Sequence, residues 1–254
     1  MSAFAESMGR MAVLTDEQMG SLWHWRPDGD GLQIRDFFHR SLEAENAQAT
    51  AIAAMGVGET AAAFLLAQRA AGDLCGLLVG QPEGILDREP APGEWSLRET
   101  MRHIIETEAH FRVGTLWAVD KAPEDPFDLP HELQTHPADV SRDPASMIAS
   151  LLDERTVSDE NFARLTADDL AKPAMWAGYS VDARFRMHRH ASHLAEHTNQ
   201  CEKVLHAIGQ DPGEARQLAR AIWAARGGHE RLSDAAALWA LDDELAARVK
   251  SFGV

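Results

Sequence analysis

The sequence predicts an all-α protein built around a four-helix bundle, and three observations support this prediction. Ala, Leu, Glu and Arg dominate the 254 residues, whereas Val, Ile, Thr and Tyr, which favour strands, are sparse. Apolar residues recur at helical spacing along several long segments. The sequence also lacks a useful run of alternating apolar and polar residues and has no Asn-Gly hairpin signal.

Four segments carry the apolar stripes of the predicted bundle. Ser96, followed three residues later by Glu99, forms the capping-box pattern that begins a helix. Asp143 before Pro144 places an N-cap ahead of a proline at the first helical position. The Pro- and Asp-rich residues 120–142 have the length of a connection that crosses along a bundle. The predicted bundle helices span residues 59–78, 96–119, 143–165 and 181–208.

The bundle is expected to occupy residues 58–208, with a helical extension at each end. The N-terminal extension, residues 1–57, is predicted to hold one helix, at about 32–55, after thirty irregular residues. The C-terminal extension, residues 209–254, is predicted to form two short helices separated by a Gly-Gly pair. A further helical turn is expected at Thr166–Asp169, between the third and fourth bundle helices.

Charge and cysteine content limit the classes of partner and the compartment. The formal net charge of −16 argues against nucleic acid and acidic membrane surfaces as partners. The sequence has no apolar run long enough to span a membrane, and Met1–Leu14 lacks the pattern of a signal peptide. Cys75 and Cys201 lie far apart in apolar helical contexts, which favours free buried thiols in a reducing compartment. We therefore expect a cytoplasmic protein.

A histidine cluster on the last predicted bundle helix is the feature most suggestive of chemistry. Four of the 12 histidines fall within ten residues, at positions 188, 190, 193 and 197. His193 and His197 are separated by four residues, so they share one helical face and can bind the same metal ion. The zinc-protease motif His-Glu-x-x-His is absent, because Leu194 follows His193, and metalloprotease activity is set aside.

A third metal ligand is expected from another helix, and His103 is the best candidate because its neighbours are core-forming apolar residues. His110 and His190 are the alternatives. A histidine in such a setting is more often an ordinary core residue bonded to a backbone carbonyl. Because His193 and His197 already form a pair on the last helix, metal binding is the more specific hypothesis for His103.

The residues around these histidines resemble a known family. The stretch Gly93-Glu-Trp-Ser-Leu-Arg-Glu99 followed by His103 is similar to the entrance of the second helix in the DinB-like family, the DNA-damage-inducible, YfiT-type bundles. The stretch His193-x-x-x-His197-x-x-Gln200 is similar to that family's final-helix signature. The order and spacing of the two motifs carry the resemblance, which covers roughly residues 58–208.

The resemblance implies an up-up-down-down bundle, frequent dimers and a three-histidine site for a divalent metal, often nickel or zinc. Carried over by position, the ligands are His103, His193 and His197. Usual members have Arg after the last ligand, whereas this chain has Thr198, so no role is expected for that Arg. The two extensions are additions to the common bundle, and we expect them either to cover the metal site or to build an interface.

Two functions from different classes follow from these motifs. The leading hypothesis is a metal-dependent enzyme acting on a small molecule, by hydrolysis or by transfer of a low-molecular-weight thiol such as bacillithiol or mycothiol, as family resemblance implies. The alternative is a non-catalytic, stress-related bundle that acts as a binding or dimerisation module. A sulfoxide synthase of the ergothioneine type is disfavoured, because His197 is not followed by the x-Glu that such domains carry.

Several residues near the histidines in sequence are candidates for a secondary role in the site. Glu106 is interpreted as a second-layer or solvated carboxylate in preference to a fourth ligand or a base. Gln200 is interpreted as a residue that supports a ligand or contributes to packing, and Cys201 as a buried structural thiol. Trp176 and Tyr179 precede the last helix and are candidates for the mouth of the site.

Overall fold

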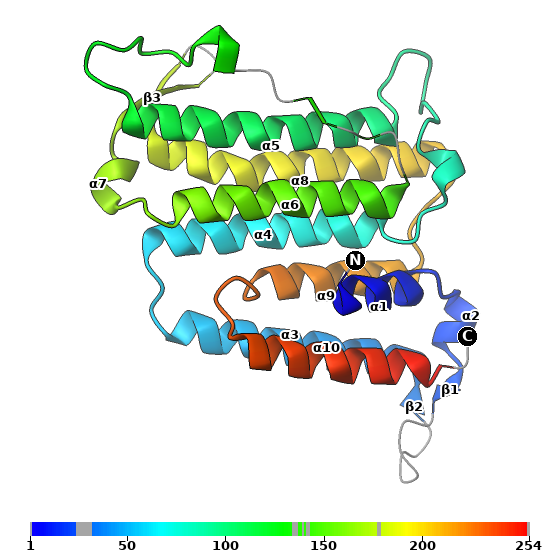
Figure 1. Ribbon diagram of the computed structural model, residues 1–254. Coiled ribbons are helices and arrows are strands. Elements are labelled where there is room, and N and C mark those ends of the chain that lie inside the picture. Colours follow the sequence, from blue (N-terminus) through cyan, green and yellow to red (C-terminus); the bar gives the residue numbers. More distant parts are fainter. Residues whose placement is uncertain are drawn as a thin grey trace.

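The computed structural model describes residues 2–23, 32–133, 137–138, 140, 143–176 and 179–252, apart from the side chains of residues 46, 47, 50 and 54. Helices make up most of this part of the chain, which confirms the all-α prediction. Figure 1 shows two layers, a four-helix bundle and a second group of helices packed along one of its faces.

Four long helices form the bundle at the positions that the sequence predicts. At the start of α5 the predicted capping box is present, with the Ser96 N–H bonded to Glu99 at 2.9 Å. Asp143 caps α6 by accepting a hydrogen bond from the Ser146 N–H at 2.9 Å. The bundle helices are α4 (Glu59–Leu78), α5 (Leu97–Asp120), α6 (Pro144–Phe162) and α8 (Ala183–Ala207).

In chain order the bundle helices run up, down, down and up (Figure 1). The connection after α4 turns back at one end, so α5 is antiparallel to α4. The long connection after α5 returns along the bundle, so α6 starts at the same end as α5 and runs parallel to it. The resemblance implied the order up-up-down-down; the length of this crossover is the physical reason for the difference. The side-chain pairs that show α5 and α6 to be parallel are Glu108–Arg155 and Asp120–Arg164.

The two extensions form the second layer together. α9 (Glu214–Gly227) packs along α4, and it is covered in turn by α1 (Ala3–Ala12) and α3 (Ile34–Ala54). α10 (Ala235–Lys250) lies against α1 and α3. The pair of helices predicted for residues 209–254 is therefore confirmed.

The prediction of a single helix in residues 1–57 is wrong, because α1 and the short α2 (Asp16–Met19) precede α3. α1 is only ten residues long, and it is stabilised by tertiary contacts that its short sequence signal does not reveal. Ser2 caps α1, and Phe4, Met8 and Met11 are buried on one face. That spacing of three and four residues was the local signal of this helix.

Two short hairpins are further departures from the sequence prediction. β1 (Leu22–Trp23) pairs with β2 (Leu32–Gln33), and β3 (Pro173–Trp176) pairs with β4 (Tyr179–Asp182), both antiparallel. Strands of two to four residues are too short to show an alternating pattern. The second hairpin occupies the predicted beginning of the last bundle helix, which is why α8 begins at Ala183.

Short helical turns complete the connections between the long helices. Thr166 and Asp169 form a capping box that begins α7 (Ala167–Leu170), which confirms the extra turn predicted there. Two 3-10 turns, η1 (Glu83–Ile85) and η2 (His131–Leu133), lie in the connections on either side of α5.

α4 is the central helix of the molecule because it contacts both layers. By length and composition it is the one helix in the described ranges that is able to cross a membrane. In the structure its apolar surface packs instead against α6, α8 and α9. The approach to α9 is close: a Cβ added at Gly72 lies 2.4 Å from the Trp223 carbonyl oxygen, and one at Gly76 lies 2.5 Å from the Arg220 Cα.

We predict that Gly76→Ala destabilises the protein because its new methyl group meets the backbone of α9. The free energy of unfolding should fall by at least about 1 kcal/mol, although Ala intrinsically favours a helix by about 1 kcal/mol over Gly. Urea denaturation is the measurement. Gly84→Ala is the control, since a Cβ at Gly84 meets no atom within 4 Å. Equal stability of the two variants would contradict the close packing of α4 on α9.

Candidate metal centre

Three imidazoles from two helices converge between α5 and α8. α5 and α8 are antiparallel neighbours, which places His103 opposite His193 and His197. The His103 Nε2 lies 3.2 Å from the His193 Nε2. One nitrogen from each of the three rings lies within 4.8 Å of the others. The residues that the sequence singled out as a third ligand and a helical pair are thus brought together.

The spacing of these nitrogens fits a single metal ion. Two imidazole nitrogens bound at about 2.05 Å to a tetrahedral zinc ion lie about 3.3 Å apart, close to the 3.2 Å between His103 and His193. His193 and His197 are buried, and His103 is half-buried at the edge of the cluster. The donor set is therefore arranged for a cation that remains accessible from one side.

A hydrogen bond orients the His197 ring. Its Nδ1 lies 2.7 Å from the Gln200 Oε1, and because a carbonyl oxygen only accepts, the Nδ1 must donate its hydrogen. The Nε2 of His197 then carries the lone pair that a metal requires. Gln200 thus has the supporting position that the sequence suggested, one turn beyond the ligand.

Burial keeps two of the rings in their neutral form. Burial, followed by the neighbouring His197 and His103, lowers the pKa of His193 to about 3. Burial also lowers the pKa of His103. Neutral imidazole is the form that binds metals, so neither ring needs to lose a proton to bind a cation at neutral pH.

Aromatic rings enclose the cluster. The Trp95 ring centroid lies 5.1 Å from that of His103, at the start of α5, and 43% of the Trp95 surface is exposed. Phe111 packs edge-on against His193 at 5.0 Å. Trp176 contacts Phe111 at 4.6 Å, so the second hairpin reaches the wall of the site. Tyr179 lies on the same hairpin but is 72% exposed, so Trp176 is the member of that pair that borders the wall.

The other sequence candidates have different partners. His190 is buried with its Nδ1 3.0 Å from the Glu108 Oε1, away from the cluster. His110 is outside the one group of potential metal-ligating side chains found in the described part of the chain. Glu106 accepts a hydrogen bond from the Ala138 N–H at 3.3 Å, so this carboxylate binds the backbone of the connection after α5.

Cys201 and Thr198 are accounted for within α8. Cys201 is a fully buried free thiol, and burial raises its pKa to about 12, so the reactive thiolate is suppressed at neutral pH. Thr198 donates a hydrogen bond to the Leu194 carbonyl at 2.8 Å. Its side chain thus satisfies a carbonyl of its own helix.

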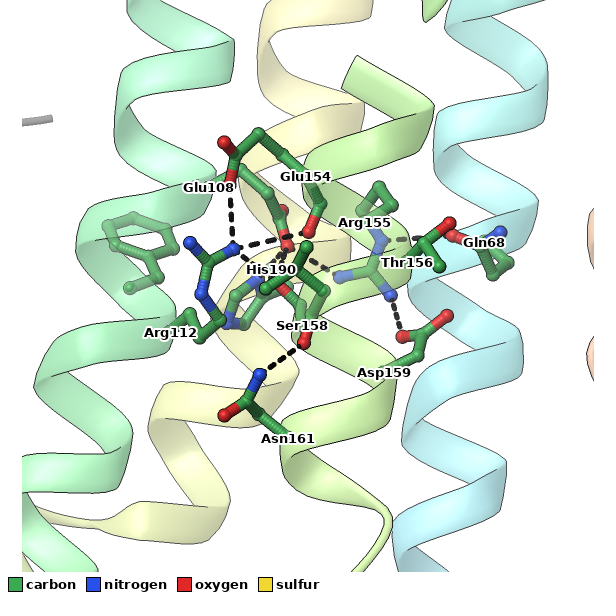
Figure 2. Close-up of polar contacts among 12 residues, drawn as sticks. Gln68, Glu108, Arg112, Glu154, Arg155, Thr156, Ser158, Asp159, Asn161 and His190 are labelled. Carbon is green, nitrogen blue, oxygen red and sulfur yellow. Dashed lines mark hydrogen bonds and ion pairs between the residues drawn. The ribbon is translucent and has the colours of Figure 1, made fainter. Parts of the chain in front are cut away.

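Sequence reasoning missed a buried ionic network beside the cluster (Figure 2). The Arg155 guanidinium donates to the Glu108 Oε1 at 2.7 Å and to the Asp159 Oδ1 at 2.6 Å. Glu108 also receives a hydrogen bond from Ser158, and contacts His190. Burial by itself raises the pKa of Glu108, but Arg155 and His190 outweigh it, and the pKa lies below its usual range. The sequence did carry a sign of this network: each of two apolar helix faces contains a charged residue, Glu108 on α5 and Arg155 on α6.

Arg186 is a second buried cation that the sequence did not single out. It lies seven residues before His193 on the same face of α8, where Gly114 of α5 leaves room: a Cβ there would lie 2.0 Å from the Arg186 guanidinium. The guanidinium donates to the Met175 carbonyl at 2.6 Å and faces the Trp176 ring. Burial lowers the pKa of Arg186 to about 10, so it stays charged at neutral pH.

Comparison with known proteins identifies the family. The family model described as the DinB superfamily matches residues 66–201, more than half of the chain. The chain belongs to the DinB superfamily. The matched range spans α5 and includes all three clustered histidines. The curated proteins include no match.

A solved structure is similar to this DinB-superfamily chain. YfiT from Bacillus subtilis is described as a probable metal-dependent hydrolase with an unusual four-helix bundle topology. It is 13% identical, with a TM-score of 0.49, and the match covers 59% of this chain and 87% of that one.

We predict that the metal-free protein loses stability as the pH falls below neutrality, and that His193 contributes to this loss. An unfolded imidazole has a pKa of about 6.5. Because the folded pKa of His193 is lowered to about 3, the unfolded state binds more protons below that value, and the free energy of unfolding decreases with falling pH. Urea denaturation at a series of pH values measures this dependence. His193→Gln should show a shallower dependence; equal slopes would contradict the assignment.

Proposed function

We propose that this protein is a divalent-metal-dependent enzyme that acts on a small molecule, of the hydrolase or thiol S-transferase type. The observation that supports the proposal is the convergence of His103, His193 and His197 on one point between α5 and α8. Three protein ligands are characteristic of catalytic zinc sites, which keep a position open for water or substrate. Imidazole ligands suit zinc and nickel, the two metals proposed here.

Each part of the site has a role in this proposal. His103, His193 and His197 hold the ion, and Gln200 fixes the ring orientation of His197. When bound, a divalent ion would supply a positive centre that lowers the pKa of a water or thiol ligand near it. Phe111 restricts access of water from the bundle interior, and the partly exposed Trp95 borders the side from which a substrate enters.

The charge near the site bears on the choice of substrates for a screen. Arg186 is buried on the same helix face as the proposed ligands and remains charged at neutral pH. A substrate with a carboxylate, including a carboxylate-bearing low-molecular-weight thiol, is the natural complement to that charge. Cys201 is not assigned as a nucleophile, because burial raises the pKa of its thiol.

We predict that His193→Ala abolishes stoichiometric binding of zinc and nickel. Protein purified without an affinity tag is analysed for bound metal by elemental analysis, and thermal unfolding is followed with each metal added. His188→Ala is the matched control, because His188 lies exposed on the same helix outside the cluster. Equal metal content in parent and His193→Ala would overturn the metal assignment.

Gln200→Leu should weaken metal binding by about 10- to 100-fold, because it removes the acceptor that fixes the His197 tautomer. Gln200→Glu keeps an acceptor and should retain most of the affinity. Asn199→Leu removes an exposed amide from the adjacent position and is the control. Competition with a metal chelator gives the affinities. An unchanged affinity in Gln200→Leu would remove Gln200 from the site.

Turnover assays on the metal-loaded protein separate catalysis from the alternative, non-catalytic function. Ester and amide hydrolysis and thiol conjugation are measured with the loaded parent and with His193→Ala. Metal-dependent turnover by the parent alone supports the enzyme. Stoichiometric metal binding without turnover across the screen would favour the binding or dimerisation module.

A homodimer, a cytoplasmic location and the absence of nucleic-acid and membrane partners belong to the same proposal. The net charge of −16 supports the exclusion of polyanions. The exposed Trp239 on α10 marks one apolar position available to a second copy. Sedimentation analysis decides between monomer and dimer.

A further inference from the structure

A second cavity lies on the other side of the bundle from the histidines. It is bounded by the start of α4, the C-terminal half of α6 and the connection between α9 and α10. Its volume is about 730 Å³, within the range of about 300–1,000 Å³ that small-molecule sites occupy. None of the three clustered histidines lines it, so this cavity is separate from the proposed metal centre.

The apolar part of the wall comes from all three boundaries. Phe64 of α4, Ala163 at the end of α6 and Leu232 after α9 line the cavity. Phe64 is partly buried and stacks on Phe162, with ring centroids 6.2 Å apart, so its ring is held in place. A fixed aromatic ring and aliphatic side chains provide a surface for the hydrocarbon body of a ligand.

The polar part of the wall is centred on Asp159, which is only 8% exposed. Its Oδ1 accepts a hydrogen bond from Arg155 at 2.6 Å, and Figure 2 shows this carboxylate held at the end of the buried network. Its Oδ2 lies 3.1 Å from the Arg231 Nε, yet the angle does not form a hydrogen bond, and neither buried atom has a hydrogen-bond partner within the described residues. This carboxylate oxygen therefore faces the Arg231 guanidinium in an ion pair that lacks hydrogen-bond geometry.

The charge of the wall is negative. Three carboxylates line the cavity, and two of them already have guanidinium partners: Glu59 pairs with Arg184, and Asp159 pairs with Arg155 and Arg231. Arg231 is engaged by its ion pair with Asp159 and by a hydrogen bond to Thr156 at 2.7 Å. Glu160 is exposed at the rim. Glu160 has no ion-pair partner among the described residues, so its charge makes the rim of the cavity complementary to a cation with an apolar body.

We infer that this cavity binds a small organic cation, an alkyl- or arylammonium whose charged group meets Asp159 and Glu160 and whose hydrocarbon body packs on Phe64 and Leu232. The position of Asp159 supports this assignment because Arg155 holds the carboxylate in place before a ligand arrives. Burial raises the pKa of Asp159 to about 6, which shows that its ionised form is under-compensated and stands to gain from a further positive charge.

The test uses three probes that share a phenyl ring and differ in charge. Phenethylammonium, 2-phenylethanol and 3-phenylpropionate are titrated into the full-length protein by isothermal calorimetry at neutral pH. Phenethylammonium should bind most tightly, the neutral alcohol more weakly, and the carboxylate most weakly. Equal affinity for the three probes, or no binding of the ammonium, would overturn the inference.

Two variants locate the binding. Ala163→Trp places a large ring in the cavity from an exposed position and should abolish binding of phenethylammonium. Glu160→Gln removes only a charge and should weaken binding by about two- to fivefold, in line with the size of solvent-exposed ion pairs. Asp153→Asn is the control, since Asp153 is exposed on α6 and does not line the cavity.

Each of the two variants tests by itself whether the cation binds in this cavity. Circular dichroism and thermal unfolding confirm that the variants are folded, and Glu160→Gln keeps the inference testable if Ala163→Trp does not fold. Unchanged affinity in a folded Ala163→Trp protein would place the ligand elsewhere. Equal effects of Glu160→Gln and Asp153→Asn would show that the overall negative charge, rather than this wall, attracts the cation.

Discussion

The buried ion pair between Arg155 and Glu108 is the interaction on which the bundle and its histidine cluster depend. Through these two residues all four bundle helices meet: Arg155 of α6 also binds Gln68 of α4, and Glu108 of α5 also binds His190 of α8. A buried charge left without its partner typically costs about 3–5 kcal/mol. The network therefore favours one register of the helices over its neighbours.

That register determines the chemistry of the site. His190 lies three residues before His193 on α8, and Glu108 lies five residues after His103 on α5. Fixing Glu108 against His190 therefore limits how far α5 and α8 can slide, and the three imidazoles meet at this setting. The same network ends at Asp159 in the wall of the second cavity, so one set of buried charges orders side chains at two separate sites.

The helix boundaries were largely predictable because their causes are local. Ser96 with Glu99, and Asp143 with Pro144, satisfy helix ends within a few residues of sequence. α1 was missed because so short a helix depends on its burial in the second layer. The second hairpin was missed because β3 and β4 are too short to show a period. The role of Arg155 was missed because its partners on the other helices, Gln68 and Glu108, are more than forty residues distant in sequence.

The sequence by itself determined the helical class, the pairing of His193 with His197 and the candidacy of His103, since helical spacing and capping are properties of neighbouring residues. Only the tertiary structure decided the chain order of the helices, the choice of His103 over His110 and His190 as the ring beside that pair, and the existence of the second cavity. These features depend on contacts between segments that are distant in sequence. The local sequence permits many such contacts, and two constraints select among them: the pairing of buried charges and the length of the crossover connection.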